Sequence, residues 1–117
     1  MLISVLKSKL HRARVTDANV DYEGSLTLSE ELMKVAQIVP YERILVGNMA
    51  NGERFETYVI RGAKHGGEIC LNGATAHLGK VGDLLTIMSF MLIEPAKAAS
   101  HKPKSVTLDG NNKPLKS

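Results

Sequence analysis

The stretch Tyr22-Glu23-Gly24-Ser25 holds the residue types that point most directly to chemistry. Gly24 tolerates backbone conformations that are closed to other residues, so backbone strain can be stored beside Ser25. The Ser25 hydroxyl could then attack the carbonyl carbon of Gly24. A Gly-Ser pair is also common in turns, so this interpretation depends on the residues found further along the chain.

Cysteine and histidine do not predict a metal site or a disulfide. The single Cys70 excludes an internal disulfide and a cysteine-based metal cluster, and its apolar neighbours favour a small core residue over a nucleophile. His65, His77 and His101 lack metal-ligand spacing, so we expect no metal. A lone cysteine is typical of a reducing compartment, and we expect a cytoplasmic protein.

Strand patterns predict the elements that must position the Gly24-Ser25 pair. The Asn51-Gly52 pair favours positive φ and a tight hairpin turn. In the second arm of that hairpin, period two places Arg54, Glu56 and Tyr58 on one side. The predicted strands cover residues 2–6, 11–16, 26–28, the hairpin arms within 44–60, a segment around 69, 84–93 and 105–108.

Helical patterns are short and few. Ser29 is a suitable N-cap for a helix that buries Leu32, Val35 and Ala36 and ends before Pro40, and a helical turn is expected at residues 74–77. Many short strands with glycine turns and two small helical pieces predict a compact, mainly-β barrel. We find no repeat and no linker, so one domain is expected, with frayed last residues.

Composition agrees with an ordinary globular domain. The 117 residues are 44% hydrophobic, 23% charged and only 4% aromatic, so the core must be aliphatic. No signal peptide is expected because Lys7 interrupts the first apolar run. The apolar run 84–93 is about half the roughly 20 residues that a membrane helix needs, so we expect a buried strand and no membrane segment.

Six segments together resemble the pyruvoyl-dependent aspartate 1-decarboxylases. They occur in the order and spacing of that family, from the N-terminus to about residue 93, in a chain of family length. Any one of them is nonspecific, and their combination carries the resemblance. The segments are Lys9-Leu10-His11-Arg12, Tyr22-Glu23-Gly24-Ser25, Asn51-Gly52-Glu53-Arg54-Phe55, Thr57-Tyr58, Ile69-Cys70-Leu71-Asn72-Gly73-Ala74 and Val81-Gly82-Asp83.

The resemblance implies that the chain cleaves itself at Gly24-Ser25. The expected products are a β-chain of residues 1–24 and an α-chain of residues 25–117 that starts with a pyruvoyl group made from Ser25. This covalently bound cofactor would form a Schiff base with L-aspartate and accept the electrons released with carbon dioxide. The product, β-alanine, would supply pantothenate and coenzyme A biosynthesis.

The resemblance also assigns roles to individual residues. Tyr58 would protonate the product, because a tyrosine with an ordinary pKa of about 10 carries its proton at neutral pH. The Thr57 hydroxyl is our candidate donor to the oxyanion formed during self-processing. Arg54 offers a planar fork for a substrate carboxylate, and Lys9 offers a second positive charge. The other residues expected at the substrate are His11, Tyr22, Asn72, Gly73, Ala74 and Thr75, with Thr57.

The family further implies a double-psi β-barrel with short helices and a homotetramer with active sites between neighbouring subunits. Two residues depart from the family pattern. Glu56 stands where a small residue is usual and could pair with Arg54, and Thr75 stands where alanine is usual and could narrow the pocket. Maturation that is spontaneous and maturation by a helper protein both agree with the resemblance.

Two alternative functions stay open. A nucleic-acid-binding barrel would draw on the net charge of +3 and on Arg12 and Arg14, which alternation places on one face opposite His11, Ala13 and Val15. The few aromatic residues do not interleave with basic ones, so we expect no nucleic-acid partner. The second alternative is a non-catalytic relative that keeps the fold without self-processing.

Overall fold

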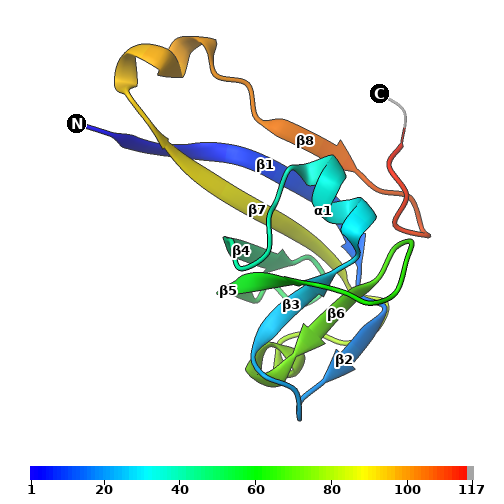
Figure 1. Ribbon diagram of the computed structural model, residues 1–117. Coiled ribbons are helices and arrows are strands. Elements are labelled where there is room, and N and C mark those ends of the chain that lie inside the picture. Colours follow the sequence, from blue (N-terminus) through cyan, green and yellow to red (C-terminus); the bar gives the residue numbers. More distant parts are fainter. Residues whose placement is uncertain (116–117) are drawn as a thin grey trace.

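The computed structural model describes residues 1–115 (Figure 1). The frayed end that we expected falls partly on residues 116–117, which lie outside the described residues. The strands are β1 (Ile3–Arg14), β2 (Asp17–Asn19), β3 (Ser25–Leu28), β4 (Arg43–Asn48), β5 (Arg54–Arg61), β6 (Ile69–Asn72), β7 (Leu84–Ile93) and β8 (Lys104–Thr107). The helices are α1 (Glu30–Ala36) and the 3-10 helices η1 (Gly73–His77) and η2 (Pro95–Ser100).

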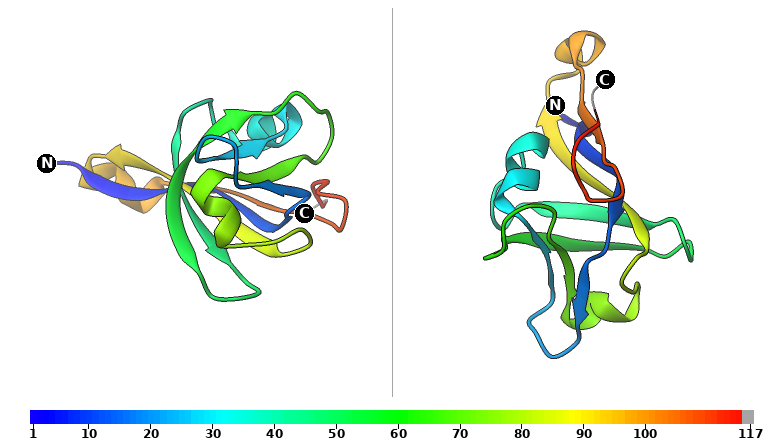
Figure 2. Two further views of the ribbon diagram at one scale, coloured as in Figure 1. Left: turned by 90° about the horizontal axis from the view of Figure 1, so that it is seen from below. Right: turned by 90° about the vertical axis from the view of Figure 1, so that its right-hand side faces the viewer.

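The strands form one mixed sheet in the order β2-β6-β3-β5-β4-β7-β1-β8. The antiparallel pairs are β1–β7, β4–β7, β4–β5 and β3–β6, and the parallel pairs are β3–β5, β2–β6 and β1–β8. The sheet curves around a common interior, with α1 beside β1 and β8 (Figure 2). The predicted mainly-β class, a double-psi β-barrel with short helices, is confirmed.

Aliphatic side chains fill that interior, as the composition predicts. They come from every part of the barrel, so strands that are distant in sequence are held together by one apolar cluster. The largest fully buried side chains are Leu10, Leu26, Leu28, Leu32, Ile44, Ile69, Leu71, Leu85, Ile87, Leu108, Val15 and Val46.

The first strand differs from the prediction. β1 runs unbroken across residues 7–10, which we did not assign to a strand, because the buried Ser8 hydroxyl is satisfied by a 2.7 Å hydrogen bond with the Ser89 hydroxyl. The alternation that we predicted for residues 11–16 is interrupted at Arg12, which has φ 63° at a register shift. Ala13 therefore follows Leu10 into the core.

The prediction of a buried strand at 84–93 holds only for its first part. Leu85 and Ile87 are buried, whereas Phe90, Met91 and Leu92 are exposed. This end of β7 pairs with the start of β1, and together with η2 it projects from the barrel (Figure 1).

The short helix forms where its cap predicts. The Ser29 hydroxyl accepts a 3.3 Å hydrogen bond from the Leu32 N–H, and α1 ends where Gln37 takes a left-handed conformation (φ 58°). Leu32 is buried as predicted, but Met33 takes the place expected for Val35, which is half-buried.

The β4–β5 hairpin turn is wider than the tight turn that we predicted at Asn51-Gly52. The last backbone pair joins the Asn48 N–H to the Glu53 carbonyl at 2.8 Å, and Gly52 alone in this turn has positive φ (77°). The Asn51 side chain accepts a hydrogen bond from the Glu53 N–H at 2.9 Å, which supports the longer loop.

Candidate active site

Ser25 is the first residue of β3 and lies directly opposite Asn72, the last residue of β6. Both are buried, at 1% and 0% exposure. The Asn72 amide nitrogen donates to the Ser25 hydroxyl at 3.0 Å, and the Ser25 hydroxyl donates to the Glu23 carbonyl at 3.2 Å. The structure therefore brings the predicted nucleophile and one predicted substrate-binding residue into direct contact.

Two further residues surround Asn72 that the sequence analysis did not place in the site. The Asn72 amide nitrogen also donates to the Thr27 hydroxyl at 2.8 Å, and the Cys70 sulfur lies 3.1 Å from the Asn72 amide oxygen. Thr27 faces Cys70 across the β3–β6 ladder, one period-two step from the Ser25–Asn72 pair. The two-residue period of a strand would have placed Thr27 and Cys70 in the site if the pairing of β3 with β6 had been known.

Gly73 is the glycine whose conformation the site requires. Its φ is +60°, and a Cβ atom there would lie 2.7 Å from the backbone nitrogen and Cα of Gly24 and from the Tyr22 carbonyl oxygen. We expected strain at Gly24 instead, but Gly24 has no positive φ and a Cβ there would meet no atom within 4 Å. The close approach of the two segments, rather than strain at the bond, makes glycine necessary.

Thr75 joins this cluster from η1. Its hydroxyl lies 2.7 Å from the Asn72 carbonyl oxygen and 3.2 Å from the Ser25 carbonyl oxygen, and its single hydrogen can be donated to either acceptor. We expected the extra hydroxyl and methyl to narrow the pocket, and the side chain is buried in contact with Ser25. Ala74 is exposed.

Lys9, His11 and Arg54 lie on the outer face of the sheet. His11 pairs with Thr86, and Gly47 links Thr86 to Arg54, so His11 and Arg54 share one row of side chains. Lys9 lies two residues from His11 on the same face.

A groove of about 310 Å³ is lined by both Lys9 and Arg54. Neither residue forms an ion pair with any other part of the described chain. Both positive charges therefore stay free for an anionic ligand.

A buried polar network supports one wall of the groove. The Asn48 amide donates to the Asp83 carboxylate at 3.0 Å, and the Lys80 N–H donates to the same carboxylate oxygen at 3.0 Å. These hydrogen bonds, the one from Asn48 first, lower the pKa of Asp83 below its ordinary value. The ionised carboxylate thus holds the loop before β7 against the β4–β5 turn.

Glu56 shares a face with Arg54 but is paired elsewhere. Its carboxylate accepts hydrogen bonds from Arg43, including one of 3.0 Å from Nε, across the β4–β5 ladder. Glu56 therefore pairs with Arg43 and does not compete with a substrate carboxylate for Arg54.

Tyr58 and Thr57 lie near the junction of β5 and β3. Tyr58 is 36% exposed on the same face as Arg54, and its ring lies 6.3 Å from the Tyr41 ring. Val59 pairs with Leu26, so Tyr58 and Ser25 each lie one residue before that pair. Thr57 is half-buried on the opposite face of β5, and within residues 1–115 its hydroxyl forms no hydrogen bond with Ser25 or its neighbours.

The predicted residues therefore form two groups on one chain. Ser25, Asn72 and Thr75 form the buried group, and the groove lined by Lys9 and Arg54 includes none of them. Tyr58 lies four positions after Arg54 on β5, a distance of about 13 Å at roughly 3.3 Å per residue. The Tyr22 side chain belongs to neither group, since it is 57% exposed.

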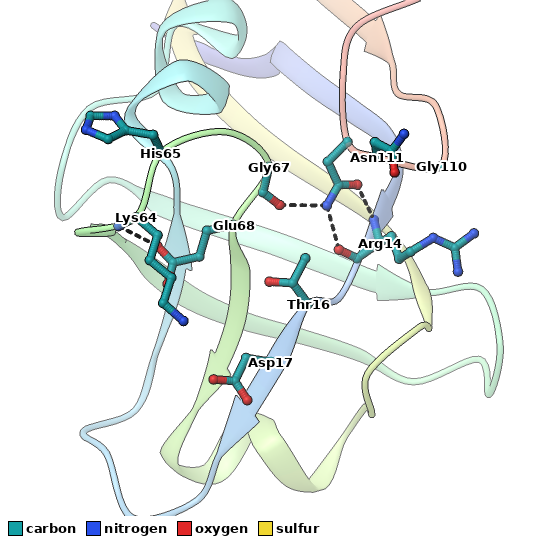
Figure 3. Close-up of a pocket in the computed structure, with 10 residues that line it drawn as sticks. Arg14, Thr16, Asp17, Lys64, His65, Gly67, Glu68, Gly110 and Asn111 are labelled. Atoms are coloured by element: carbon teal, nitrogen blue, oxygen red, sulfur yellow. Dashed lines mark hydrogen bonds between the residues drawn. The ribbon is translucent and has the colours of Figure 1, made fainter.

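Another hollow of about 400 Å³ contains none of the predicted site residues (Figure 3). Basic and acidic side chains line it, including Arg14, Lys64 and Glu68. Asn112 closes it with hydrogen bonds of 2.8 Å to the Arg14 backbone N–H, the Arg14 carbonyl and the Gly67 carbonyl. Through these hydrogen bonds, the Asn112 side chain attaches the C-terminal segment to the barrel.

Residues 1–115 contain neither a cluster of metal-binding side chains nor a membrane-spanning helix. No cluster of three or more histidine, cysteine or acidic side chains there could hold a metal ion. No helix there has the length and apolar character needed to cross a membrane.

Comparison with known proteins identifies the family. A model of the family described as aspartate decarboxylase matches residues 1–115. The aspartate 1-decarboxylase of Syntrophobacter fumaroxidans is 56% identical over 111 residues, which cover 95% of this chain and 90% of that protein. The enzyme of the same name from Caldicellulosiruptor saccharolyticus is 54% identical, and the match covers 99% of this chain and 91% of that protein. The enzyme of the same name from Legionella pneumophila (strain Paris) is 53% identical, and the match covers 93% of this chain and 82% of that protein. The chain therefore belongs to the aspartate decarboxylase family.

Proposed function

We propose that this chain decarboxylates L-aspartate to β-alanine and carbon dioxide, with a pyruvoyl group made from its own Ser25, and so supplies pantothenate and coenzyme A biosynthesis. The observation that carries the proposal is the surroundings of Ser25, whose buried hydroxyl follows Gly24 and accepts a hydrogen bond from Asn72. Family membership supports the reaction itself. The ketone would supply an electron sink when the substrate loses its carboxylate.

The proposed maturation starts at the Gly24–Ser25 peptide bond. The Ser25 oxygen adds to the Gly24 carbonyl carbon, and the C–N bond breaks as its nitrogen takes the hydroxyl proton, which leaves an ester. Loss of the Ser25 α-proton expels the Gly24 carboxylate, and water then displaces the nitrogen as ammonia. A ketone remains at the former Ser25 α-carbon, and the single domain now consists of residues 1–24 and 25–117.

The buried group fits a ketone at this position. The Asn72 amide nitrogen points at the Ser25 side chain, and the Thr75 hydroxyl contacts the Ser25 carbonyl. Both donors sit where water is excluded, so their hydrogen bonds to a developing negative charge are strong. Thr57 keeps its proposed part as an additional oxyanion donor.

The groove supplies what an aspartate substrate needs. Its two carboxylates require positive charge, and Lys9 and Arg54 line the groove without ion-pair partners among the described residues. Arg54 would bind one carboxylate through its planar fork. Tyr58 would return a proton to the carbon that carried the departing carboxylate. His11, Tyr22, Gly73 and Ala74 would complete the substrate site.

The separation of the two groups supports an active site shared between subunits. Ser25, Asn72 and Thr75 do not line the groove of the same chain. A second copy could bring its own Lys9 and Arg54 to Ser25, and we therefore propose the homotetramer with sites between neighbours. The exposed apolar end of β7, with Phe90 and Leu92, offers surface for such contacts.

The nucleic-acid alternative loses its main structural support. Arg12 lies at the bulge of β1, and the Arg14 guanidinium donates to the Gly82 carbonyl at 3.2 Å, so the expected basic stripe is not continuous. Affinity for DNA or RNA that falls steeply with salt would revive this alternative.

Two substitutions test the proposed function. Ser25→Ala should abolish both chain cleavage and β-alanine production, since no hydroxyl remains to become the ketone. Tyr58→Phe should cleave at the normal rate but turn over slowly, which separates maturation from catalysis. Decarboxylation that survives Ser25→Ala would refute the pyruvoyl mechanism, and a wild-type chain that stays uncut with every candidate helper would favour the non-catalytic relative.

A further inference from the structure

Cys70 touches the residue that holds Ser25. It lies on β6, two residues before Asn72, so the two side chains project from the same face of the strand. The Cys70 sulfur is 3.1 Å from the Asn72 amide oxygen. Among the described residues, the Cys70 thiol is the one donor to that oxygen.

The hydroxyl groups around Asn72 fix which way its amide points. Ser25 uses its hydroxyl hydrogen toward the Glu23 carbonyl, which can only accept. The atom of Asn72 that lies 3.0 Å from the Ser25 oxygen must therefore be the nitrogen. The amide oxygen is then left facing Cys70. The thiol has one hydrogen, and the Asn72 oxygen at 3.1 Å is a closer acceptor for it than the Leu71 carbonyl oxygen at 3.8 Å.

The thiol is in the form that this contact requires. Cys70 is 7% exposed, and burial, followed by the nearby carboxylates of Asp17 and Glu68, raises the pKa of its thiol. A protonated thiol is a weak hydrogen-bond donor, whereas a thiolate would repel the amide oxygen. The burial and the hydrogen bond thus favour one orientation of the Asn72 amide.

We propose that Cys70 is a positioning residue, which locks the Asn72 amide with its N–H groups toward Ser25. Without this donor, the amide oxygen is buried unsatisfied, and a rotated amide would turn that oxygen toward the Ser25 and Thr27 hydroxyls, which the amide nitrogen contacts in the structure. The lock would act in chain cleavage and again in substrate binding. This inference rests on the proposed function for its activity readouts, but the amide orientation itself does not.

Three variants separate the donor from the volume of the side chain. Cys70→Ser keeps a donor and loses volume, Cys70→Ala loses both, and Cys70→Val fills the space without a donor. Serine and alanine form the matched pair, because they differ by one hydroxyl. We expect the alanine and valine variants to cleave roughly tenfold more slowly, the effect of leaving one buried acceptor without a donor, and serine to stay within about twofold of wild type.

Two further readouts report on the Asn72 amide directly. In the uncut chain, the side-chain N–H signals of Asn72 should exchange slowly with solvent in wild type and Cys70→Ser, and faster in Cys70→Ala and Cys70→Val. In matured protein, the alanine variant should lower kcat more than it raises KM for aspartate, because the Asn72 amide is proposed to donate to the negative charge that develops during the reaction.

The outcomes distinguish this inference from the proposed function. Alanine and valine variants with wild-type cleavage and wild-type amide exchange would overturn it, as would a serine variant as impaired as alanine. A wild-type chain that never cleaves would count against the proposed function, and the amide exchange of the uncut variants would still decide whether Cys70 holds Asn72.

Discussion

Replacing Asn72 with alanine should destabilise the fold more than its small size suggests. The Asn72 side chain is fully buried and takes part in three contacts, with the Ser25 hydroxyl, the Thr27 hydroxyl and the Cys70 thiol. The variant removes all three. Ser25 keeps its hydrogen bond to the Glu23 carbonyl, whereas Thr27 loses its side-chain partner in a site that is 6% exposed.

The magnitude follows from these contacts. A neutral hydrogen bond contributes about 1 kcal/mol net to stability, and a hydrogen bond from a thiol contributes less. A buried hydroxyl that is left without a partner costs roughly a further 1 kcal/mol or more. The expected loss is therefore about 2–4 kcal/mol in the free energy of unfolding. At a urea dependence of about 2 kcal/mol/M, the midpoint should fall by roughly 1–2 M.

The assay is urea unfolding at equal protein concentration, with the cleavage state of each sample matched by mass. Asn19→Ala is the matched control, because Asn19 pairs with Asn72 across the β2–β6 ladder but is exposed. This control should change the free energy of unfolding by about 0.5 kcal/mol or less. If Asn72→Ala shifts the midpoint no more than Asn19→Ala does, the buried network around Ser25 is not formed as described.

Three other variants test neighbouring parts of the site. Because the folded-state pKa of Asp83 lies below its ordinary value, the contribution of this carboxylate to stability should be complete above about pH 4 and be lost as the pH falls through the lower folded value. The urea midpoint of the wild type should therefore drop more steeply on acidification than the midpoint of Asp83→Asn. Parallel profiles of the two proteins would contradict this. Thr75→Ala should lose about 1 kcal/mol of unfolding free energy yet still cleave, since alanine is usual at this position in the family; complete loss of cleavage, measured by mass, would show that the hydroxyl is required. Arg43→Ala should raise KM for aspartate several-fold by releasing Glu56 toward Arg54, and adding Glu56→Ser should restore it; an unchanged KM in the single variant would show that the Arg43 pair does not protect the substrate site.

Local periodicity predicted the parts of the fold that depend on neighbours in sequence. The β5 pattern correctly placed Arg54, Glu56 and Tyr58 on one face, and Ser29 correctly marked the start of α1. The continuous β1 was missed because a polar residue, Ser8, is buried there, and its partner Ser89 lies 81 positions away.

The site itself depends on contacts that local patterns do not contain. Asn72 meets Ser25 only because β6 pairs with β3, and the sequence alone does not specify which strands are neighbours. The same pairing explains why Gly73, and not Gly24, needs to be glycine. The partner of Glu56 was also missed, since Arg43 reaches it across a hairpin ladder from 13 positions away.

The intact mass of the purified protein under denaturing conditions shows whether the chain is cut before Ser25 and whether a pyruvoyl group is formed there. We expect the 12.7 kDa chain to give two fragments, residues 1–24 and residues 25–117, and the larger one to carry a carbonyl that borohydride reduces. Ser25→Ala, prepared in parallel, should remain a single chain. A wild-type protein that stays uncut but produces β-alanine from aspartate would contradict the proposed mechanism.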